Sequence, residues 1–440
     1  MSADAASDST PRWLNAVIAL SLGIMLVLCT FENHSRVGRA ITSGFAIAAI
    51  SICVYQKRIS THRIRGFTES VLLIYAAIIA SCYYSIEKLY SFKNFLYYQH
   101  FWFGILFLCI GVWATTRARQ YHILIGFAVA GVVSAALGLI VLYKGRQLVN
   151  AGLIDQLTDF VYKAQDADGA PYYRAKGMLE SYTKSASVFI MALPAMVALL
   201  MHEARRRKFF TSLLIIIAMI ISAWFLMMTK SRGAWIGAGI ACVGTMFLLR
   251  GRWWIPFAGI AVIILAGLAS PSVRQRASSF VSDATRPDLL FSGRFVLWNQ
   301  GLHTIEKNPL TGIGYGGNIF LTDNGLERYE LRSAGFRQPD LHEVYLQTLA
   351  ETGVLGFAAY GFFLILLLRT AYIAIREQWA DGLPPGLAVA FPALIGMLIF
   401  GFVYNFNERH IAQLVATMGA LIPASAIVAR RSLRTAVSPP

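Results

Sequence analysis

Charged residues are scarce in this chain of 440 residues. They make up 14% of it, whereas a soluble domain carries about 25%, and hydrophobic residues reach 56%. Acidic residues are the scarcest, because 23 of them face 39 lysines and arginines and leave a net charge of +16. No soluble core of this size needs so much apolar surface. The basic residues lie mostly in short connections between apolar stretches, so the excess indicates membrane orientation and argues against a nucleic-acid partner.

Features that build other kinds of sites are also missing. The five cysteines all fall inside apolar stretches, which excludes a disulfide framework: Cys29, Cys53, Cys82, Cys109 and Cys242. No cluster of His, Asp or Glu has metal-ligand spacing, so we expect neither a metal nor another cofactor. We find no internal repeat, low-complexity tract or second soluble domain. The polar start, Met1 to Arg12, lacks a cleavage site after the first apolar stretch, which we interpret as a retained helix.

Long apolar stretches fill most of the remaining sequence. Runs of about 17–25 residues have the length that spans a bilayer, and backbone groups in lipid must bond within their own segment. The sequence therefore predicts an all-α, polytopic transmembrane helical bundle of about 12 spanning helices, with residues 1–440 forming a single integral membrane domain. The expected spans are 13–31, 37–55, 67–86, 95–114, 121–143, 185–201, 210–229, 233–249, 253–270, 353–373, 384–404 and 410–429.

The basic residues alternate from one side of these spans to the other. Eighteen lie on one set of connections (Arg12, 57–65, 117–119, 205–208, 250–252, 369–376 and 430–434), and seven lie on the other. The positive-inside rule puts the first set, and with it both termini, in the cytoplasm. Two long loops, 144–184 and 271–352, then fall outside. Amphipathic runs at 295–305 and 341–350 predict short helices in the second loop, and a loop this long is typically functional.

His342 is the strongest candidate for a base in the second loop. Asp340 is a plausible N-cap and Glu343 stands three residues later, as in a capping box, so we expect His342 in the first turn of a helix. The positive end of the helix dipole disfavours imidazolium there, which leaves a neutral histidine that can accept a proton. The alternative is a structural histidine that bonds a loop carbonyl.

Basic side chains on the outer side suit a phosphate. Lys230 and Arg232 lie in the short connection Thr229–Gly233, Arg294 begins an amphipathic run, and Arg337 lies five residues before His342. The planar guanidinium of arginine matches phosphate oxygens, so these groups would suit a lipid-linked phosphate or pyrophosphate. The alternative for each of them is an interfacial side chain that extends toward lipid head groups.

Three other motifs carry less weight. Asp166-Ala-Asp168 matches a metal and nucleotide-sugar motif, but it lies on the outer side, and we interpret it as chance. The glycine-rich run Gly312–Gly317 lacks a framing strand and helix and predicts a turn after Pro309. Glu408, Arg409 and His410 open the last span from outside, where they either pair with one another or line the same cavity.

The motifs of the second half resemble those of the O-antigen ligase superfamily. They are Ser231-Arg232-Gly233-Ala234, Gly293-Arg294 with Trp298, Asn308-Pro309-Leu310-Thr311-Gly312-Ile313-Gly314, and His342-Glu343 followed by Tyr345, Gln347, Glu351 and Gly353. The order and spacing of these blocks carry the resemblance from about Lys230 to Gly356, and the span pattern extends it over the chain.

This resemblance implies a multi-pass protein of the bacterial inner membrane with a periplasmic active site. It implies metal-independent, inverting transfer of a glycan from undecaprenyl pyrophosphate to a sugar hydroxyl of lipid A–core. His342 matches the proposed catalytic base, and Arg232 and Arg294 match positions that bind the pyrophosphate. Two features depart from the family pattern. Glu343 stands where relatives often have Asn, and residues 177–184 lack the usual Asn-containing block, which leaves the role of Lys184 open.

Related activities are the nearest alternatives. An O-antigen polymerase joins repeat units to one another, and a protein O-oligosaccharyltransferase acts on a protein acceptor. A transporter for a lipid-linked glycan is an alternative from another class. It should show paired repeats and either intramembrane ionisable residues or broken helices near the midplane, and the sequence shows neither clearly.

Overall fold

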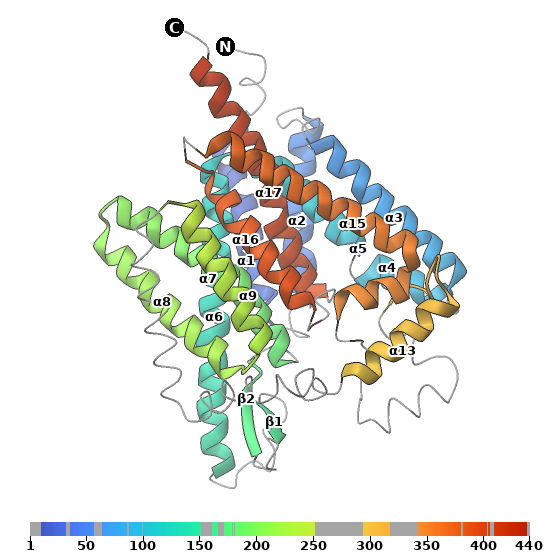
Figure 1. The fold of residues 1–440 in the computed structure, drawn as a ribbon. Helices are drawn as coiled ribbons and strands as arrows, with labels where there is room; N and C mark the ends of the chain where they lie inside the picture. Colours follow the sequence, from blue (N-terminus) through green and yellow to red (C-terminus); the bar gives the residue numbers. More distant parts are fainter. Residues whose placement is uncertain are drawn as a thin grey trace.

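The computed structural model is dominated by long apolar helices (Figure 1). It describes residues 10–31, 36–56, 64–85, 88–98, 100–150, 161–165, 171–177, 179, 181–250, 294–316, 341, 343–379, 382–402, 404 and 409–437. The helices are α1 (Arg12–Leu28), α2 (Arg36–Tyr55), α3 (Arg65–Tyr84), α4 (Lys88–Tyr98), α5 (His100–Trp113), α6 (Arg117–Asn150), α7 (Tyr182–Arg205), α8 (Phe209–Met228), α9 (Arg232–Leu248), α13 (Arg294–Lys307), α15 (Val344–Gln378), α16 (Pro385–Gly401) and α17 (Arg409–Val437).

These helices confirm the predicted fold class. Eight helical segments are long and apolar enough to cross a membrane, and α1, α9 and α16 are shorter apolar helices of 17 residues each. Together they coincide with eleven of the twelve expected spans. The span expected at 95–114 consists of α4 and α5 in succession, and the one expected at 253–270 lies outside the described residues.

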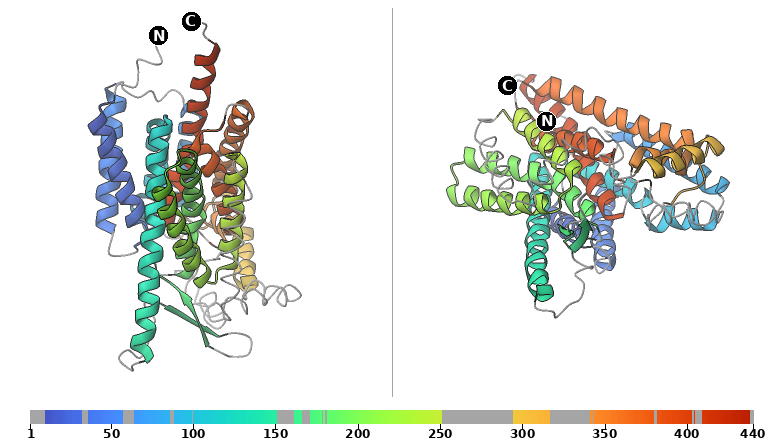
Figure 2. Two further views of the ribbon diagram at one scale, coloured as in Figure 1. Left: turned by 90° about the vertical axis from the view of Figure 1, so that its left-hand side faces the viewer. Right: turned by 60° about the horizontal axis from the view of Figure 1, so that its bottom comes forward.

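The bundle has two distinct ends. The start of α1 and the C-terminal part of α17 lie together at one end, and α13 and a β-hairpin lie at the other (Figure 2). We call the second of these the hairpin end. Both helical segments nearest the termini therefore emerge on one side of the bundle, as the alternation of basic loops requires.

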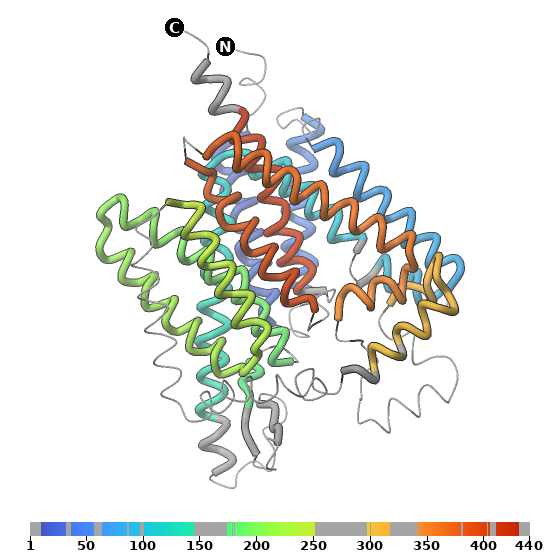
Figure 3. The backbone as a smooth tube through the Cα atoms, viewed as in Figure 1, coloured from blue at the N-terminus to red at the C-terminus, as the bar shows by residue number. Residues whose placement is uncertain are grey.

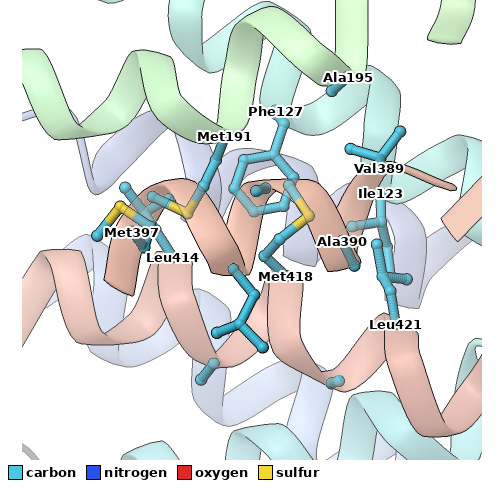
Figure 4. Packing of buried hydrophobic residues seen from close by; sticks show 14 of the residues in the cluster. Ile123, Phe127, Met191, Ala195, Val389, Ala390, Met397, Leu414, Met418 and Leu421 are labelled. Atoms are coloured by element: carbon cyan, nitrogen blue, oxygen red, sulfur yellow. The ribbon is translucent and has the colours of Figure 1, made fainter. Parts of the chain in front are cut away.

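Four helices build the centre of the core. Aliphatic, aromatic and methionine side chains of α6, α7, α16 and α17 interlock there, including Phe127, Met191, Met397 and Leu414 (Figure 4). Small residues bring α9 and α16 still closer: a Cβ on Gly237 would lie 2.8 Å from the carbonyl oxygen of Gly396. Helices in lipid pack through such small residues because close backbone approach gains van der Waals contact.

The hairpin was not predicted. Strands β1 (Val161–Gln165) and β2 (Pro171–Ala175) pair antiparallel, with Val161 opposite Ala175, in the first long loop. Helix α6 also continues to Asn150, well past the end of its expected span. Neither extension has a long apolar or strictly alternating pattern, which is the signal that sequence periodicity can detect.

Helix α15 is broken near its start. Gly353 has φ +62° and ψ −169°, which separates a first segment, residues 344–352, from a second, residues 354–378. The predicted short helix at 341–350 and the predicted span at 353–373 are thus both confirmed, joined at this residue. This break lies near one end of α15 and not near its middle, so it does not supply the midplane break expected of a transporter.

Candidate functional site

The turn between α8 and α9 lies at the hairpin end, beside the start of α7 (Figure 3). This turn carries Lys230 and leads into Arg232. Its conformation is fixed by Trp235, whose indole Nε1 donates to the carbonyl of Leu226 at 3.0 Å. Arg232 is the first residue of α9 and is half-buried, and Lys230 is only 3% exposed. Basic groups at a helix N-terminus, where backbone N–H groups also point outward, form a favourable place for an anion.

Lys230 has a left-handed backbone, with φ +53°. Arg207 (φ 57°) and Arg250 (φ 49°) adopt the same conformation just after α7 and α9, so each of the three directly follows a helix C-cap, where a left-handed residue commonly ends a helix. The strain alone therefore does not mark Lys230 as functional. Its burial does distinguish it, because Arg207 and Arg250 are exposed at the opposite end of the bundle.

Two further basic residues at this end were missed or left open by sequence reasoning. Arg174 of β2 is 8% exposed, and its guanidinium lies 4.4 Å from the centre of the Tyr182 ring. Lys184, in the first turn of α7, is 7% exposed. Buried cations at a membrane boundary are costly and mark functional positions. Lys184 was visible in the sequence as a cation directly before the expected span 185–201, but Arg174 needed the hairpin.

Helix α13 lies on the same end but belongs to a different packing unit. Leu297, Ile313, Leu341 and Ala350 form a small apolar cluster, separate from the main core. Arg294 begins α13, and its side chain lies outside the described part. The cluster thus places the helix that carries Arg294 directly against the backbone next to position 342.

A glycine-rich turn closes the break in α15. As predicted, the chain turns after Pro309, and Gly312 and Gly314 have positive φ. The N–H groups of Ile313 and Gly314 donate to the carbonyls of Ala350 and Glu351 at 3.0 and 3.1 Å.

The same turn also serves the second segment of α15. Val354 and Leu355 donate to the carbonyls of Pro309 and Leu310 at 2.8 and 3.2 Å. Backbone groups on both sides of the break therefore find hydrogen-bond partners within the protein, as a lipid-embedded chain requires.

The start of α15 differs from the prediction. Glu343, not Asp340, is the N-cap: its carboxylate accepts the N–H groups of Tyr345 (3.1 Å) and Leu346. Position 342 therefore precedes the helix and is not in its first turn. The carboxylate already occupies the positive end of the helix, so the dipole argument for a neutral His342 loses its basis. The sequence did not reveal this cap, because the residue type alone does not tell whether a glutamate stands at the N-cap or three residues after it.

Burial changes the acidity of this cap. The pKa of Glu343 is raised because its carboxyl is taken out of water, although the hydrogen bonds from Leu346 and Tyr345 act in the opposite direction. Burial also raises the pKa of Tyr315, in the glycine-rich turn, well above its ordinary value. The carboxyl of Glu343 and the hydroxyl of Tyr315 are therefore both withdrawn from water.

Helix α16 contacts both α9, which follows the turn with Lys230 and Arg232, and the start of α15. It contacts α9 through Gly396, and two residues further along it the carbonyl of Leu398 accepts a hydrogen bond from the Tyr345 hydroxyl at 2.7 Å. Arg232 lies one helical turn and a half before Gly237, about 7–8 Å along α9 at 1.5 Å per residue. Lys230, Arg232 and the start of α15 therefore surround the same end of α16, whereas His342 and Arg337 lie outside the described residues.

An apolar cavity lies below the start of α15. It has a volume of about 230 Å³ and is lined by Tyr345, Thr348, Phe363, Leu394 and Val415, among others. These residues come from α15, α16 and α17, so the cavity lies within the membrane-spanning part and extends to Val344 and Tyr345 at the start of α15.

The remaining candidate motifs add little. Asp166, Asp168 and Glu408 lie outside the described residues, and Arg409 and His410 begin α17 without described side chains. Within the described ranges, no group of three His, Cys, Asp or Glu residues could hold a metal ion.

Comparison with known proteins identifies the central part of the chain. Residues 217–361 match the family described as O-Antigen ligase. A relative, "Exopolysaccharide production protein ExoQ" of Rhizobium meliloti (strain 1021), is 26% identical over 148 residues. That alignment covers 32% of this chain and 32% of the relative, so the chain spans about a third of the length of the curated relative it matches. Lys230, Arg232, Arg294, Arg337 and His342 all fall inside the matched range. The resemblance predicted from the motifs is thereby confirmed: this is a polytopic membrane protein in which residues 217–361 match the O-antigen ligase family.

Proposed function

We propose that this chain is an O-antigen ligase of the bacterial inner membrane. It transfers a glycan from undecaprenyl pyrophosphate to a sugar hydroxyl of lipid A–core, on the periplasmic side, with both termini in the cytoplasm. The observation that supports the proposal is that α9, which Lys230 and Arg232 introduce, and the start of α15 both contact the same end of α16, within the segment that matches the family. Long apolar helices around this end suit a substrate that stays in the membrane.

The proposed reaction is a single displacement. The acceptor hydroxyl attacks the anomeric carbon, its proton passes to His342, and the bond from that carbon to the pyrophosphate oxygen breaks with its electron pair on the leaving group. Inversion at the anomeric carbon follows from one displacement. A hydroxyl benefits from a base within hydrogen-bond reach because its pKa is far above neutrality.

Basic residues would stabilise the leaving group. Pyrophosphate needs charge compensation more than protonation, and Lys230, Arg232, Arg294 and Arg337 supply positive charge without a metal ion. Arg174 and Lys184 join this group, because they are buried at the same end of the bundle. The apolar cavity below Tyr345 suits part of a prenyl chain.

A cell-free transfer assay with purified protein, carrier-linked glycan and lipid A–core tests the base. His342→Ala should abolish ligated product while leaving donor binding nearly unchanged, because the histidine acts on the acceptor. Full activity in this variant would exclude His342 as the base. Product formation that persists in excess chelator is expected, and its loss would contradict the metal-independent mechanism.

A polymerase is the second candidate, and the relative named for exopolysaccharide production favours it. The two functions differ in what accumulates when the protein is lost. Deletion of a ligase leaves complete polymer on the lipid carrier, whereas deletion of a polymerase leaves single repeat units on lipid A–core. Electrophoresis of lipopolysaccharide from a deletion strain, with the carrier-linked glycan analysed alongside, distinguishes them.

A further inference from the structure

A chain of side-chain hydrogen bonds reaches the backbone next to position 342. The carbonyl oxygen Oε1 of Gln347 accepts the N–H of Leu341 at 3.0 Å. The other end of the same amide, Nε2, donates to the Oε1 atom of Glu351. Both side chains are buried, with Gln347 1% and Glu351 5% exposed.

The chemistry of the two partners fixes how Gln347 is oriented. A backbone N–H needs an acceptor, and a carboxylate or carboxyl carbonyl needs a donor, so the amide oxygen must face Leu341 and the amide nitrogen must face Glu351. The Gln347 side chain therefore cannot turn over without losing both bonds. Each lost bond would leave a buried polar group unsatisfied, which destabilises the folded protein.

The far end of this chain is anchored to other elements. The backbone carbonyl of Glu351 accepts from the Ser81 hydroxyl of α3 at 2.7 Å and from the N–H of Gly314 at 3.1 Å. Position 351 is thus held by α3 and by the glycine-rich turn, directly before the break in α15. Glu343 holds the other neighbour of position 342, because its carboxylate caps the helix.

We propose that Gln347 is a positioning residue for the transfer reaction, with Glu351 as its support. The pair fixes the backbone at Leu341 while Glu343 fixes the helix start, so residue 342 is carried between two restrained neighbours. This inference rests on the proposed function, in which His342 accepts the acceptor proton. Catalytic groups held by such supporting bonds lose rate when the support is removed, by 10-fold to about 100-fold for displacements near 1 Å.

Four variants of the pair give the test, each assayed for donor consumption and product with carrier-linked glycan and lipid A–core. Gln347→Met keeps the size of the side chain and removes both bonds, and we expect kcat to fall at least about tenfold, with the KM for donor changed less than twofold. Gln347→Glu places two carboxyl groups together, so its kcat should fall at least as far. Glu351→Gln keeps an acceptor for Gln347 and should stay within about threefold of the parent rate.

The double variant Gln347→Glu with Glu351→Gln restores the chain with its polarity reversed. The new carboxylate accepts both from Leu341 and from the amide at position 351, so kcat should recover to within about threefold of the parent, a coupling that two independent sites would not show. Failure to recover, or failure of this double variant to accumulate in membranes, would overturn the proposal, because the pair would then serve only folding.

Gln378→Met is the matched control. Gln378 lies on the same helix, is 1% exposed, and donates one hydrogen bond to the carbonyl of Ala429 at 2.9 Å, far from position 342. It should lower thermal stability without changing kcat. His342→Ala distinguishes failure of the proposed base from failure of the positioning role of Gln347. A fully active His342→Ala removes the proposed base, whereas an inactive His342→Ala beside a fully active Gln347→Met leaves the base and overturns the positioning role.

Discussion

Two parts of the candidate site are built in contrasting ways. The cations at the start of α9 extend from the main core, where α9 packs closely on α16 through Gly237 and Gly396. The backbone beside position 342 instead depends on the small apolar cluster, on a glycine-rich turn and on the side chains of Glu343 and Gln347. The first part depends on close helix packing, and the second depends on hydrogen bonds between segments far apart in the sequence.

This contrast has a chemical reason. Charge compensation of a flexible pyrophosphate tolerates small displacements, since Coulomb attraction falls off gradually with distance. Proton transfer does not, because the base must lie within hydrogen-bond reach of the hydroxyl. We therefore expect disturbances of the second part to lower kcat, and disturbances of the first part to weaken donor binding.

The largest effect should come from the break in α15. A Cβ on Gly353 would lie 2.3 Å from the backbone carbonyl carbon of Leu310, and its positive φ strains any L-residue. Gly353→Ala should therefore displace the glycine-rich turn and destabilise the protein by at least about 2 kcal/mol. The transfer rate should fall by more than about 100-fold, because a displaced turn also displaces the backbone beside the proposed base.

Gly239 of α9 is the matched control for this substitution. A Cβ there would meet nothing within 4 Å, so Gly239→Ala should leave transfer unchanged and slightly stabilise the helix. Thermal unfolding in detergent and the transfer assay measure both variants. Normal activity in Gly353→Ala would mean that the break is incidental to the site.

A smaller effect is expected at the first part of the site. Arg232→Lys keeps the charge but removes the planar fork, so the KM for donor should rise about tenfold with kcat changed little. Arg250→Lys, at the other end of the same helix, should leave the donor KM unchanged, since Arg250 lies over the Trp379 ring at the opposite end of the bundle. An equal rise in both variants would point to general surface charge and not to a donor site.

The small apolar cluster offers the next comparison. Leu341 is 3% exposed, and Leu341→Ala should loosen the backbone beside position 342 and lower kcat about fivefold, by partial loss of positioning. Leu414→Ala, a change at a fully buried residue of the main core, should instead lower the global unfolding free energy by about 2–5 kcal/mol. Hydrogen exchange should increase over α13 in the first variant and over α16 and α17 in the second. The same exchange pattern in both would show that the cluster and the core unfold as one unit.

The sequence predicted the membrane-spanning elements far better than the connections between them. Apolar length alone located eleven spans, because lipid forces such segments to be helical. The amphipathic runs beginning at Phe295 and Leu341 also correctly predicted short helices. Both signals are local, and each depends on the residues of one segment.

The features that were missed depend on contacts between segments. Gly353 can break α15 only because Pro309 and Leu310 supply carbonyls to the N–H groups that the break exposes. Arg174 became a candidate only once the hairpin brought β2 against Tyr182. The capping role of Glu343 depends on where α15 begins, a boundary that residue spacing defines only to within a few positions.

The smallest expected effect concerns the pH dependence at Glu343. Its pKa is raised in the folded protein, so the folded state holds this proton more tightly than the unfolded state. The stability contributed by the proton is complete below the ordinary value of 4.5 and is lost as the pH rises through the folded pKa. Glu343→Gln cannot titrate. The unfolding free energy of the parent relative to this variant should therefore fall with rising pH.

Thermal unfolding in detergent at a series of pH values from 4.5 upward measures this difference. Two contributions compete at this position. Burial favours the protonated carboxyl, whereas the N–H groups of Tyr345 and Leu346 favour the carboxylate. A difference that rises with pH would mean that the two cap hydrogen bonds outweigh burial. Charge would then dominate at the start of α15, as it does among the cations at the start of α9. The two parts of the site would differ only in how their helices and turns pack.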